Sequence, residues 1–586
     1  MRQWMVAAKK ADFYVIAEKF HVDPVVARII RNREVIGEKN IRIYLGGNLS
    51  DLSDPHQMKD MDRLVEILAQ KIRKQVHIRI IGDYDVDGVT SSHLFLTALR
   101  RVGAKVDVVI PHRIQDGYGL SLHLLQQAKE DGVDTILTCD NGIAAIDEIA
   151  WAKAQKMTVL VTDHHAVPFE EHEGRRTEKK SLADAVVNPH QQDCGYPYKE
   201  LCGAGVAWNV IRVLYENYDM DKREAEDLLD FVAMATVCDV MSLTGENRIL
   251  VKEGLKRIRH TKNIGLQALM QACNVQPENI SAYHFGYVLG PCVNATGRLD
   301  TARHALRLFE TGQETEAEEI ARDLVDLNQE RKELTLQGVE MAKKLCEEGG
   351  YENDPVLVLF LPDVHESIAG LIAGRIREMY NRPVFVLTRG EEGVKGSGRS
   401  TENYSMYENM CGCAELFTKF GGHPMAAGLS LPEENVEKFR RKINENCPLT
   451  VEEVCPDIHI DMAMPVGYAS TELVHQFALL EPFGKDNPSP LFADRNLSIS
   501  RMWVIGKNRN VLRMSVLSEY GQPVPVIFFG DVETLFAYFT EKFGQKEVEN
   551  ALHGRKNRIL FSMVYTVKID FYQGNENLQL EMKYYR

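Results

Sequence analysis

The sequence predicts an α/β protein in which a parallel-sheet domain is followed by a long connector helix, a smaller α/β domain and a C-terminal β-barrel. Three observations carry this prediction. From residue 76 onward, short Val/Ile-rich runs alternate with amphipathic helices, which is typical of βα units on a parallel sheet. A charged, periodic segment over 301–346 lacks the usual helix breakers after Gly312, and the residues from 455 onward are β-rich with Gly and Asn turns.

The chain has 586 residues, which predicts several domains. We expect five segments in this order: a polar helical extension over 1–70, the larger α/β domain over 71–300, the connector helix over 301–348, the smaller α/β domain over 349–450, and a barrel of the OB type over 451–586. In the larger domain the expected strands include HIRII, KVDVVI, DTILTC and MTVLVT, each followed by polar residues.

The composition excludes some classes of protein. Lys and Arg number 69 and Asp and Glu number 84, so the formal net charge is −15. Such a chain is not expected to coat nucleic acid by bulk charge, because nucleic-acid footprints are basic. No run of apolar residues is long enough to span a membrane, and the N-terminus does not have the pattern of a signal peptide. The eleven cysteines are scattered, so we expect a cytoplasmic protein with reduced thiols.

Three carboxylates lie at the end of the first βα strand, in the segment GDYDVDG. Asp83, Asp85 and Asp87 alternate with other residues, so an extended chain places them on one side. Like charges at this spacing repel unless a cation neutralises them, and hard ions such as Mg²⁺ and Mn²⁺ suit oxygen ligands. A calcium loop is an alternative, although Leu94 stands where that loop would carry its twelfth-position glutamate.

Further acidic and imidazole groups follow the next strands. Asp140 lies in TCDNG, His164 and His165 lie in VTDHH, and Asp239 follows a helix in ATVCDV. Each motif alone is commonplace, but the carboxyl ends of parallel strands meet at one edge of a sheet. Together the groups supply oxygen and nitrogen ligands without a thiolate, which is the ligand set of a two-metal phosphoesterase with ions about 4 Å apart.

These motifs resemble, in order, those of the DHH phosphoesterase superfamily, and within it the RecJ single-stranded-DNA exonucleases. Later segments also match this family: FGYVLGPCVNATGRL at 285–299, KGSGRS at 395–400, GGHPMAAG at 421–428 and LLEPFGKDNPSPLF at 479–492. The resemblance covers about 70–586. It implies a DHH catalytic domain, a DHHA1 domain and an OB domain.

By this resemblance two ions, Mn²⁺ or alternatively Mg²⁺, are expected in each active site. Asp85 and Asp140 would hold one ion with support from Asp83. The other ion would be held by Asp87, Asp140, His164 and Asp239. Asp140 would bridge the ions, and His165 would contact the scissile phosphate and stabilise its developing charge. The resemblance therefore gives Asp87, Asp140 and His165 as the catalytic residues.

Candidate substrate contacts are spread over five segments. Ser397 and Arg399 lie in a glycine-rich turn where hydroxyl, backbone N–H and guanidinium groups suit a phosphate. Other candidates are Tyr118, Asn294, Arg298 and His423. Over 501–514 the chain has no acid and carries basic residues around an aromatic, a pattern typical of single-strand binding: Arg501, Trp503, Lys507, Arg509 and Arg513. The alternative for each is a structural role, such as a salt bridge or a buried ring.

The resemblance implies a 5′→3′ exonuclease that degrades single-stranded DNA to mononucleotides in recombination and repair. It implies a monomer, with a single-strand-binding protein and a helicase as candidate partners and no membrane association. The alternative function is a related phosphodiesterase acting on short oligoribonucleotides or cyclic dinucleotides. Such relatives generally end after the GGH motif, so the long segment beyond Gly428 favours the exonuclease.

Overall fold

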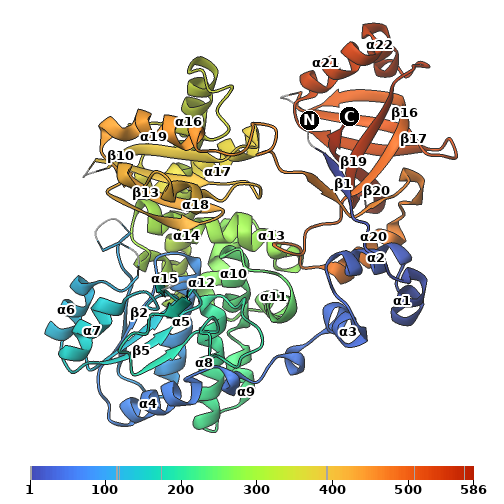
Figure 1. Ribbon diagram of the computed structural model, residues 1–586. Helices are drawn as coiled ribbons and strands as arrows, with labels where there is room; N and C mark the ends of the chain where they lie inside the picture. Colours follow the sequence, from blue (N-terminus) through green and yellow to red (C-terminus); the bar gives the residue numbers. More distant parts are fainter. Residues whose placement is uncertain are drawn as a thin grey trace. The chain divides into compact units, whose positions relative to one another are not determined.

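The chain folds into two compact units, each described here by itself (Figure 1). The first unit contains residues 52–242 and 246–456, and the second contains 3–51, 243–245 and 457–586. The computed structural model describes residues 3–113, 116–117, 119–172, 175–390, 393–506, 509–572 and 574–586. Within these residues, no helix combines the length and the apolar character that crossing a membrane requires.

The first unit is built on the predicted parallel sheet. Its strands run in the order β3 (Val106–Val109), β2 (Ile78–Ile81), β4 (Thr135–Cys139), β5 (Thr158–Thr162) and β8 (Ala185–Val187), and every neighbouring pair is parallel. The first strand of this sheet along the chain, β2, has its sequence successor β3 on one side and β4 on the other. Ligands in open α/β sheets bind at such a switch point, beyond the carboxyl ends of the strands.

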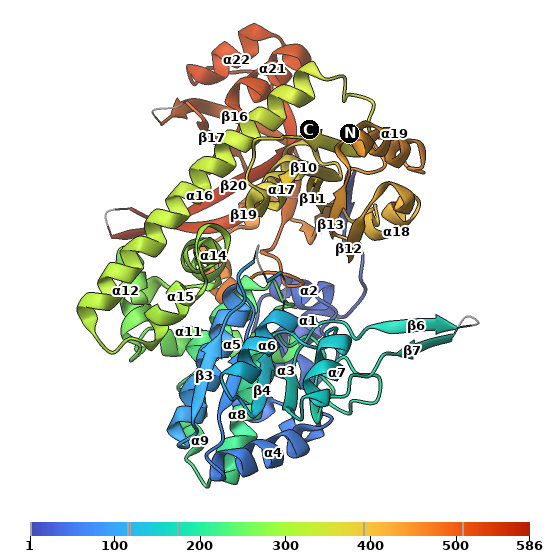
Figure 2. The ribbon, with the colours of Figure 1, turned by 90° about the vertical axis from the view of Figure 1, so that its left-hand side faces the viewer.

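Helices cover both faces of this sheet. On one face α6 (Leu122–Glu130) and α7 (Ile146–Ala154) pack their apolar residues against β4 and β5. On the other face lie α5 (Val86–Arg101) and α8 (Gly203–Asn217), with α4 (Met61–Arg73) packed against α8. A hairpin of β6 (Phe169–His172) and β7 (Arg175–Glu178) projects from the domain in Figure 2.

The connector segment contains two helices, α15 (Arg303–Glu310) and α16 (Glu314–Glu348). The chain leaves the helical conformation at Thr311, whose backbone is extended, so the long helix starts later than the sequence indicates. At a rise of about 1.5 Å per residue, α16 spans about 50 Å. It packs on α12 (Ile264–Ala272) and α14 (Gly290–Leu299) of the larger domain and on α17 (Ala369–Tyr380) of the smaller one, so it joins the two (Figure 2).

The smaller domain has a mixed sheet in the order β12 (Lys419–His423), β13 (Ala426–Leu431), β11 (Gly393–Arg399), β10 (Val384–Gly390) and β9 (Leu357–Phe360). Only β9 and β10 are parallel. Helices α16 and α17 cover one face, and α18 (Met406–Cys411) and α19 (Val436–Glu445) cover the other. A Cβ at Gly396 would lie 2.3 Å from Leu387, so this strand needs glycine for close packing.

The second unit contains the predicted barrel. Strands β16 (Phe492–Ile505), β17 (Val511–Leu517), β18 (Pro523–Phe529), β20 (Asn575–Tyr585) and β19 (Leu560–Tyr572) are neighbours in that order, and β19 pairs back to β16 to close the barrel. Helices α21 (Val532–Phe543) and α22 (Gln545–Leu552) lie between β18 and β19 in the chain. The predicted fold class, α/β with a C-terminal OB-like barrel, is confirmed.

The N-terminal segment is shared between the two units. Strand β1 (Trp4–Val6) pairs with β14 (Ile458–Ile460), and α1 (Phe13–Phe20) and α2 (Pro24–Asn32) contribute to the apolar core of the barrel unit. Helix α4 belongs to the first unit instead. The residues expected as one extension over 1–70 therefore lie in two places, because the apolar face of α2 is buried against the barrel.

Candidate metal centre and phosphate cavity

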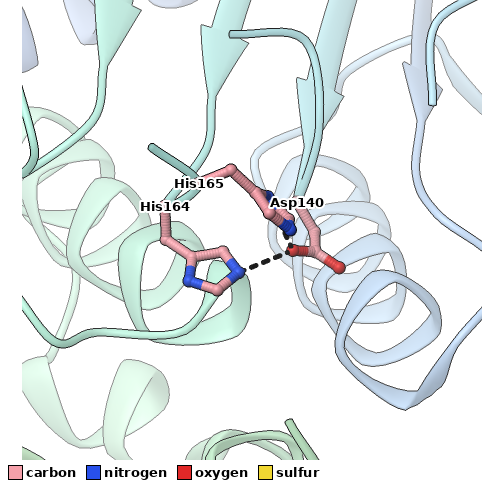
Figure 3. A group of neighbouring side chains, drawn as sticks. All are labelled: Asp140, His164 and His165. Carbon is pink, nitrogen blue, oxygen red and sulfur yellow. Dashed lines mark ion pairs between the residues drawn. The ribbon is translucent and has the colours of Figure 1, made fainter. Parts of the chain in front are cut away.

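The acidic and imidazole side chains that follow the parallel strands come together at the switch point between β2 and β4. Asp83 and Asp85 follow β2, Asp140 follows β4, and His164 follows β5. Asp239 arrives from outside the sheet, at the C-terminal end of α10 (Leu229–Cys238). Figure 3 shows the rings of His164 and His165 directed toward the same carboxylate oxygen of Asp140.

The ligand atoms form two adjacent groups. Carboxylate oxygens of Asp83, Asp85 and Asp140 lie within 4.8 Å of one another, and so do ligand atoms of Asp87, His164 and Asp239. His164 connects the groups, because its Nε2 lies 3.1 Å from Asp140 Oδ1, 3.5 Å from Asp239 Oδ2 and 3.7 Å from Asp87 Oδ2. Asp140 therefore lies between the two groups of candidate metal ligands, where its carboxylate can take part in both.

Backbone geometry holds this arrangement. Asp140 has a φ of 62°, in the left-handed region that non-glycine residues seldom adopt outside constrained sites. A Cβ at Gly203 would lie 2.6 Å from the Asp140 Cβ, so only glycine fits beside it. The N–H groups of Gly203 and Ala204, at the start of α8, donate to the two oxygens of Asp87 at 2.6 and 2.7 Å. The sequence analysis missed these donors.

Electrostatic repulsion in the cluster favours a bound cation. Burial, with the charge of Asp85, raises the pKa of Asp83 well above its usual range, and the same causes raise the pKa of Asp87 to about 6. Burial and neighbouring acids also raise the pKa of Asp140. Burial lowers the pKa of His164 to about 3, so its ring is neutral and available as a ligand.

The donor atoms fit a divalent ion. Asp83 Oδ1 and His164 Nε2 are buried and make no hydrogen bond within the residues that the structure describes. A buried polar atom without a hydrogen bond is costly, and coordination to a cation removes that cost. Carboxylate oxygens with one imidazole and no thiolate suit Mn²⁺ or Mg²⁺.

His165 is oriented by Asp163, a residue that the sequence analysis did not assign to the site. Asp163 Oδ1 accepts hydrogen bonds from His165 Nδ1 at 2.8 Å and from the His165 backbone N–H at 3.0 Å. Its other oxygen accepts from the N–H of Ile143 at 2.9 Å. Burial opposes a charge on His165, but Asp163 and the nearby acids outweigh it and raise its pKa to about 9.

A cation-lined cavity of about 570 Å³ lies beside the acidic turn, between the larger and smaller domains. Tyr84, which sits between Asp83 and Asp85 in the chain, lines it. Basic side chains come from both domains: Arg113, Arg298, Lys395, Arg399 and Lys419. Glu366 also lines the cavity but forms an ion pair with Lys395 at 2.8 Å.

The arginines of the cavity are held close together. Burial and the charges of Arg113, Arg331 and Arg399 lower the pKa of Arg298 to about 10. Arg298 Nη1 donates to the backbone carbonyl of Ser367 at 2.5 Å, which links α14 to the smaller domain. Convergent guanidinium groups repel one another, so an anion in this cavity would be bound strongly.

Arg113 is a cavity residue that the sequence analysis missed. Its guanidinium lies 4.0 Å from the ring centroid of Tyr84, and its Nε donates to the carbonyl of Gly297 at 3.0 Å. A Cβ at Gly297 would lie 2.3 Å from the carbonyl oxygen of Tyr84, so the NATGR segment needs glycine here. Arginine in a loop has no periodic pattern that would have identified it.

The remaining predicted substrate residues have different positions. Ser397 lines the cavity, and Arg399 lines it with its Nη1 bonded to the carbonyl of Gly398. Asn294 accepts a hydrogen bond from the N–H of Val86, at the start of α5. His423 is exposed at the end of β12 and is not one of the residues that line the cavity. Tyr118 lies outside the described residues.

In the barrel unit, three of the predicted residues share one exposed face of β16 and β17. Trp503 pairs across the strands with Arg513, and the Arg501 guanidinium lies 5.7 Å from the Trp503 ring centroid. Trp503 is 38% exposed, while the alternate residues Met502 and Met514 point into the core. Arg509 is exposed in the turn between the strands, and Lys507 lies outside the described residues.

The fold and the site together define a DHH-type protein. The family model for the DHH family N-terminal domain matches residues 77–236, the DHHA1 domain matches 353–447, and the RecJ OB domain matches 460–584.

Individual relatives carry the comparison further. The single-stranded-DNA-specific exonuclease RecJ of Haemophilus influenzae is 32% identical over 582 residues, which is 96% of each chain. The RecJ of Bacillus subtilis is 33% identical over 511 residues, and this chain spans 63% of its length. The crystal structure of Thermus thermophilus RecJ with Mn²⁺ matches with a TM-score of 0.81 at 25% identity, covering 100% of this chain and 79% of that one. This chain belongs to the RecJ family.

Proposed function

We propose that the protein is a metal-dependent 5′→3′ exonuclease that degrades single-stranded DNA to mononucleotides and serves recombination and repair. One observation carries the proposal: the cation-lined cavity lies next to the acidic cluster. Tyr84, between two of the metal-ligand candidates in the chain, lines this cavity. A terminal phosphate in this cavity would leave the first phosphodiester bond near the ligand groups. The names of the relatives support this reading.

Two divalent ions are part of this proposal, with Mn²⁺ preferred and Mg²⁺ as the alternative, as in the Thermus structures with each ion. Asp83, Asp85 and Asp140 would hold one ion. The other would be held by Asp87, Asp140, His164 and Asp239. When bound, the ions would neutralise charge on the phosphate and lower the pKa of a nucleophilic water.

The chain's own residues would bind and orient the substrate. Arg298, Arg399 and Arg113 would bind the 5′-phosphate through charge-assisted hydrogen bonds, with the hydroxyl of Ser397 as a further donor. His165, held by Asp163, would donate to the scissile phosphate and stabilise its developing charge. A cavity that recognises a 5′-terminal phosphate would give the proposed polarity.

The exposed face of Arg501, Trp503 and Arg513 would bind the strand further from its end. Charged groups track the phosphates and an aromatic ring stacks on bases of any sequence. The proposal also includes weaker roles for Tyr118, His423, Lys507 and Arg509. The proposal also describes a monomeric, cytoplasmic enzyme that acts with a single-strand-binding protein and a helicase. Its domain division keeps the four expected segments from residue 71 onward, while residues 3–70 are divided between the two units.

The test compares 5′-phosphorylated single-stranded DNA, the matching duplex and a diribonucleotide, each incubated with Mn²⁺. We expect mononucleotides from the single strand alone, and none from the Asp140→Ala variant. If the single strand survives while the diribonucleotide is hydrolysed, the protein is instead a phosphodiesterase that acts on short oligoribonucleotides.

A further inference from the structure

Two tyrosines are exposed at the start of the helical stretch that borders the metal centre. Tyr283 in α13 (Ala282–His284) and Tyr287 in the π-helical turn η4 (Phe285–Leu289) are 63% and 72% exposed. Their ring centroids lie 5.1 Å apart with planes inclined by 23°, so the rings are stacked. Large apolar groups gathered on a surface mark binding sites, and π-helical turns are frequent at functional sites.

This turn packs beside the last turn of α10. The thiol of Cys238 donates to the carbonyl of Phe285 at 3.3 Å. A Cβ at Gly286 would lie 3.5 Å from the side chain of Val237. The residue that follows Cys238 is Asp239, a member of the second ligand group. The turn that carries Tyr287 therefore packs against the two residues that precede Asp239.

The same helical stretch reaches the phosphate cavity at its other end. After η4 the chain continues into α14, where Asn294 contacts Val86 and Arg298 lines the cavity. At about 1.5 Å per residue, the 11 residues from Tyr287 to Arg298 span roughly 17 Å along the helix. The stretch thus runs from the tyrosines, past the acidic turn, to the cavity.

We infer that Tyr283 and Tyr287 form a platform on which bases 3′ of the scissile phosphate stack, an inference that rests on the proposed function. Stacked nucleotides rise about 3.4 Å each, so a stacked strand whose 5′-phosphate lies in the cavity would pass the metal centre and reach the platform after about five nucleotides. Tyrosine rings stack on bases without regard to sequence, as a degrading enzyme requires. The platform binds the strand and takes no part in the reaction.

The test uses 5′-phosphorylated oligothymidylates of three and twenty nucleotides. For the Tyr283→Ala/Tyr287→Ala variant we expect KM for the 20-mer to rise about tenfold, with kcat and the kinetics of the 3-mer unchanged. The Tyr283→Phe/Tyr287→Phe variant keeps both rings and should restore KM. Tyr14→Ala removes a tyrosine that is 78% exposed on α1 and serves as the matched control.

Equilibrium binding of the labelled 20-mer to the same variants, each carrying Asp140→Ala, gives a second readout. We expect the alanine pair to raise Kd about tenfold and the phenylalanine pair to leave it unchanged. Unchanged KM and Kd for the 20-mer would overturn the platform, and so would an equal loss on the 3-mer. If the wild type degrades neither substrate, the proposed function fails, and the binding measurement still decides on the platform.

Discussion

Asn294 on α14 accepts a hydrogen bond from the backbone N–H of Val86 at 3.1 Å. Val86 lies between Asp85 and Asp87, so this bond ties the acidic turn to the helix that also carries Arg298. The position of the metal ligands and the position of the cavity arginine therefore depend on one helix. The asparagine of the NATGR segment therefore supports the acidic turn through a backbone hydrogen bond.

The Asn294→Ala variant is expected to lower both kcat and stability. Leaving the Val86 N–H without its acceptor costs about 1–3 kcal/mol, and the turn that carries Asp85 and Asp87 loses its support. Urea unfolding and steady-state kinetics measure the two effects. Asn279→Ala, at an exposed position, is the control. Wild-type kinetics for Asn294→Ala would show that the acidic turn keeps its conformation without this hydrogen bond.

The Arg399→Ala variant is expected to weaken the use of 5′-phosphorylated ends while metal binding stays intact. Loss of charge-assisted hydrogen bonds worth about 1.5–3 kcal/mol corresponds to a rise in KM of about tenfold or more. Substrates with a 5′-hydroxyl should be affected little. The control is Arg389→Ala, an exposed arginine of the same domain that pairs with Glu433. Equal losses on both kinds of end would exclude a role in phosphate recognition.

The Asp163→Asn variant is expected to lose about 10- to 100-fold in activity, because residues that orient groups of a metal site have effects of this size. The amide still accepts one hydrogen bond, but the charge that favours the Nδ1–H form of His165 is gone. Single-turnover rates at saturating substrate measure the effect. Asp147→Asn, on the exposed side of α7, should leave the rate unchanged. A rate equal to that of the wild type would show that Asp163 does not contribute to orienting His165.

Away from the site, a half-buried ion pair predicts a pH dependence of stability. Arg79 on β2 is 7% exposed and donates to both oxygens of Asp107 on β3, at 3.0 and 2.7 Å. Burial raises the pKa of Asp107, but the bonds to Arg79 outweigh it, and the pKa is lowered. The stabilisation is therefore present above the ordinary carboxyl pKa and is lost as pH falls through the lowered value.

We expect Asp107→Asn to lower the free energy of unfolding by about 1 kcal/mol at pH 7, a small value because the Asp107 side chain is partly exposed. The difference from wild type should vanish as pH falls below the lowered pKa. Urea midpoints at several pH values measure it, with Asp326→Asn, at an exposed position of α16, as the control. If the difference in unfolding free energy between the variant and the wild type grows toward low pH, Asp107 is not stabilised in its ionised form by Arg79.

Most of the acidic cluster could be predicted because strands of a parallel sheet end at the same edge. Asp83, Asp140 and His164 each follow a strand whose apolar run is visible in the sequence. The N–H groups of Gly203 and Ala204 could not be predicted, since backbone donors leave no trace in residue type. Arg113 was missed for a related reason, because its role depends on a loop that folds back on Tyr84.

The net charge of −15 could not indicate where a strand would bind. The structure separates the charges: acids converge at the metal centre, while Arg113, Arg298 and Arg399 converge at the cavity. Binding of a polynucleotide depends on the phosphates neutralised in contact and not on the net charge of the protein. An acidic chain can therefore hold a single strand at a local basic site.

The order in which labelled nucleotides leave a single strand tests the account most directly. The substrate is 5′-phosphorylated DNA labelled on its first or its last nucleotide, incubated with Mn²⁺. The account predicts that the 5′ label appears at once as a mononucleotide while the 3′ label stays on a strand that shortens step by step. Release of the 3′ label first, or cleavage that continues with the divalent ions removed, would contradict it.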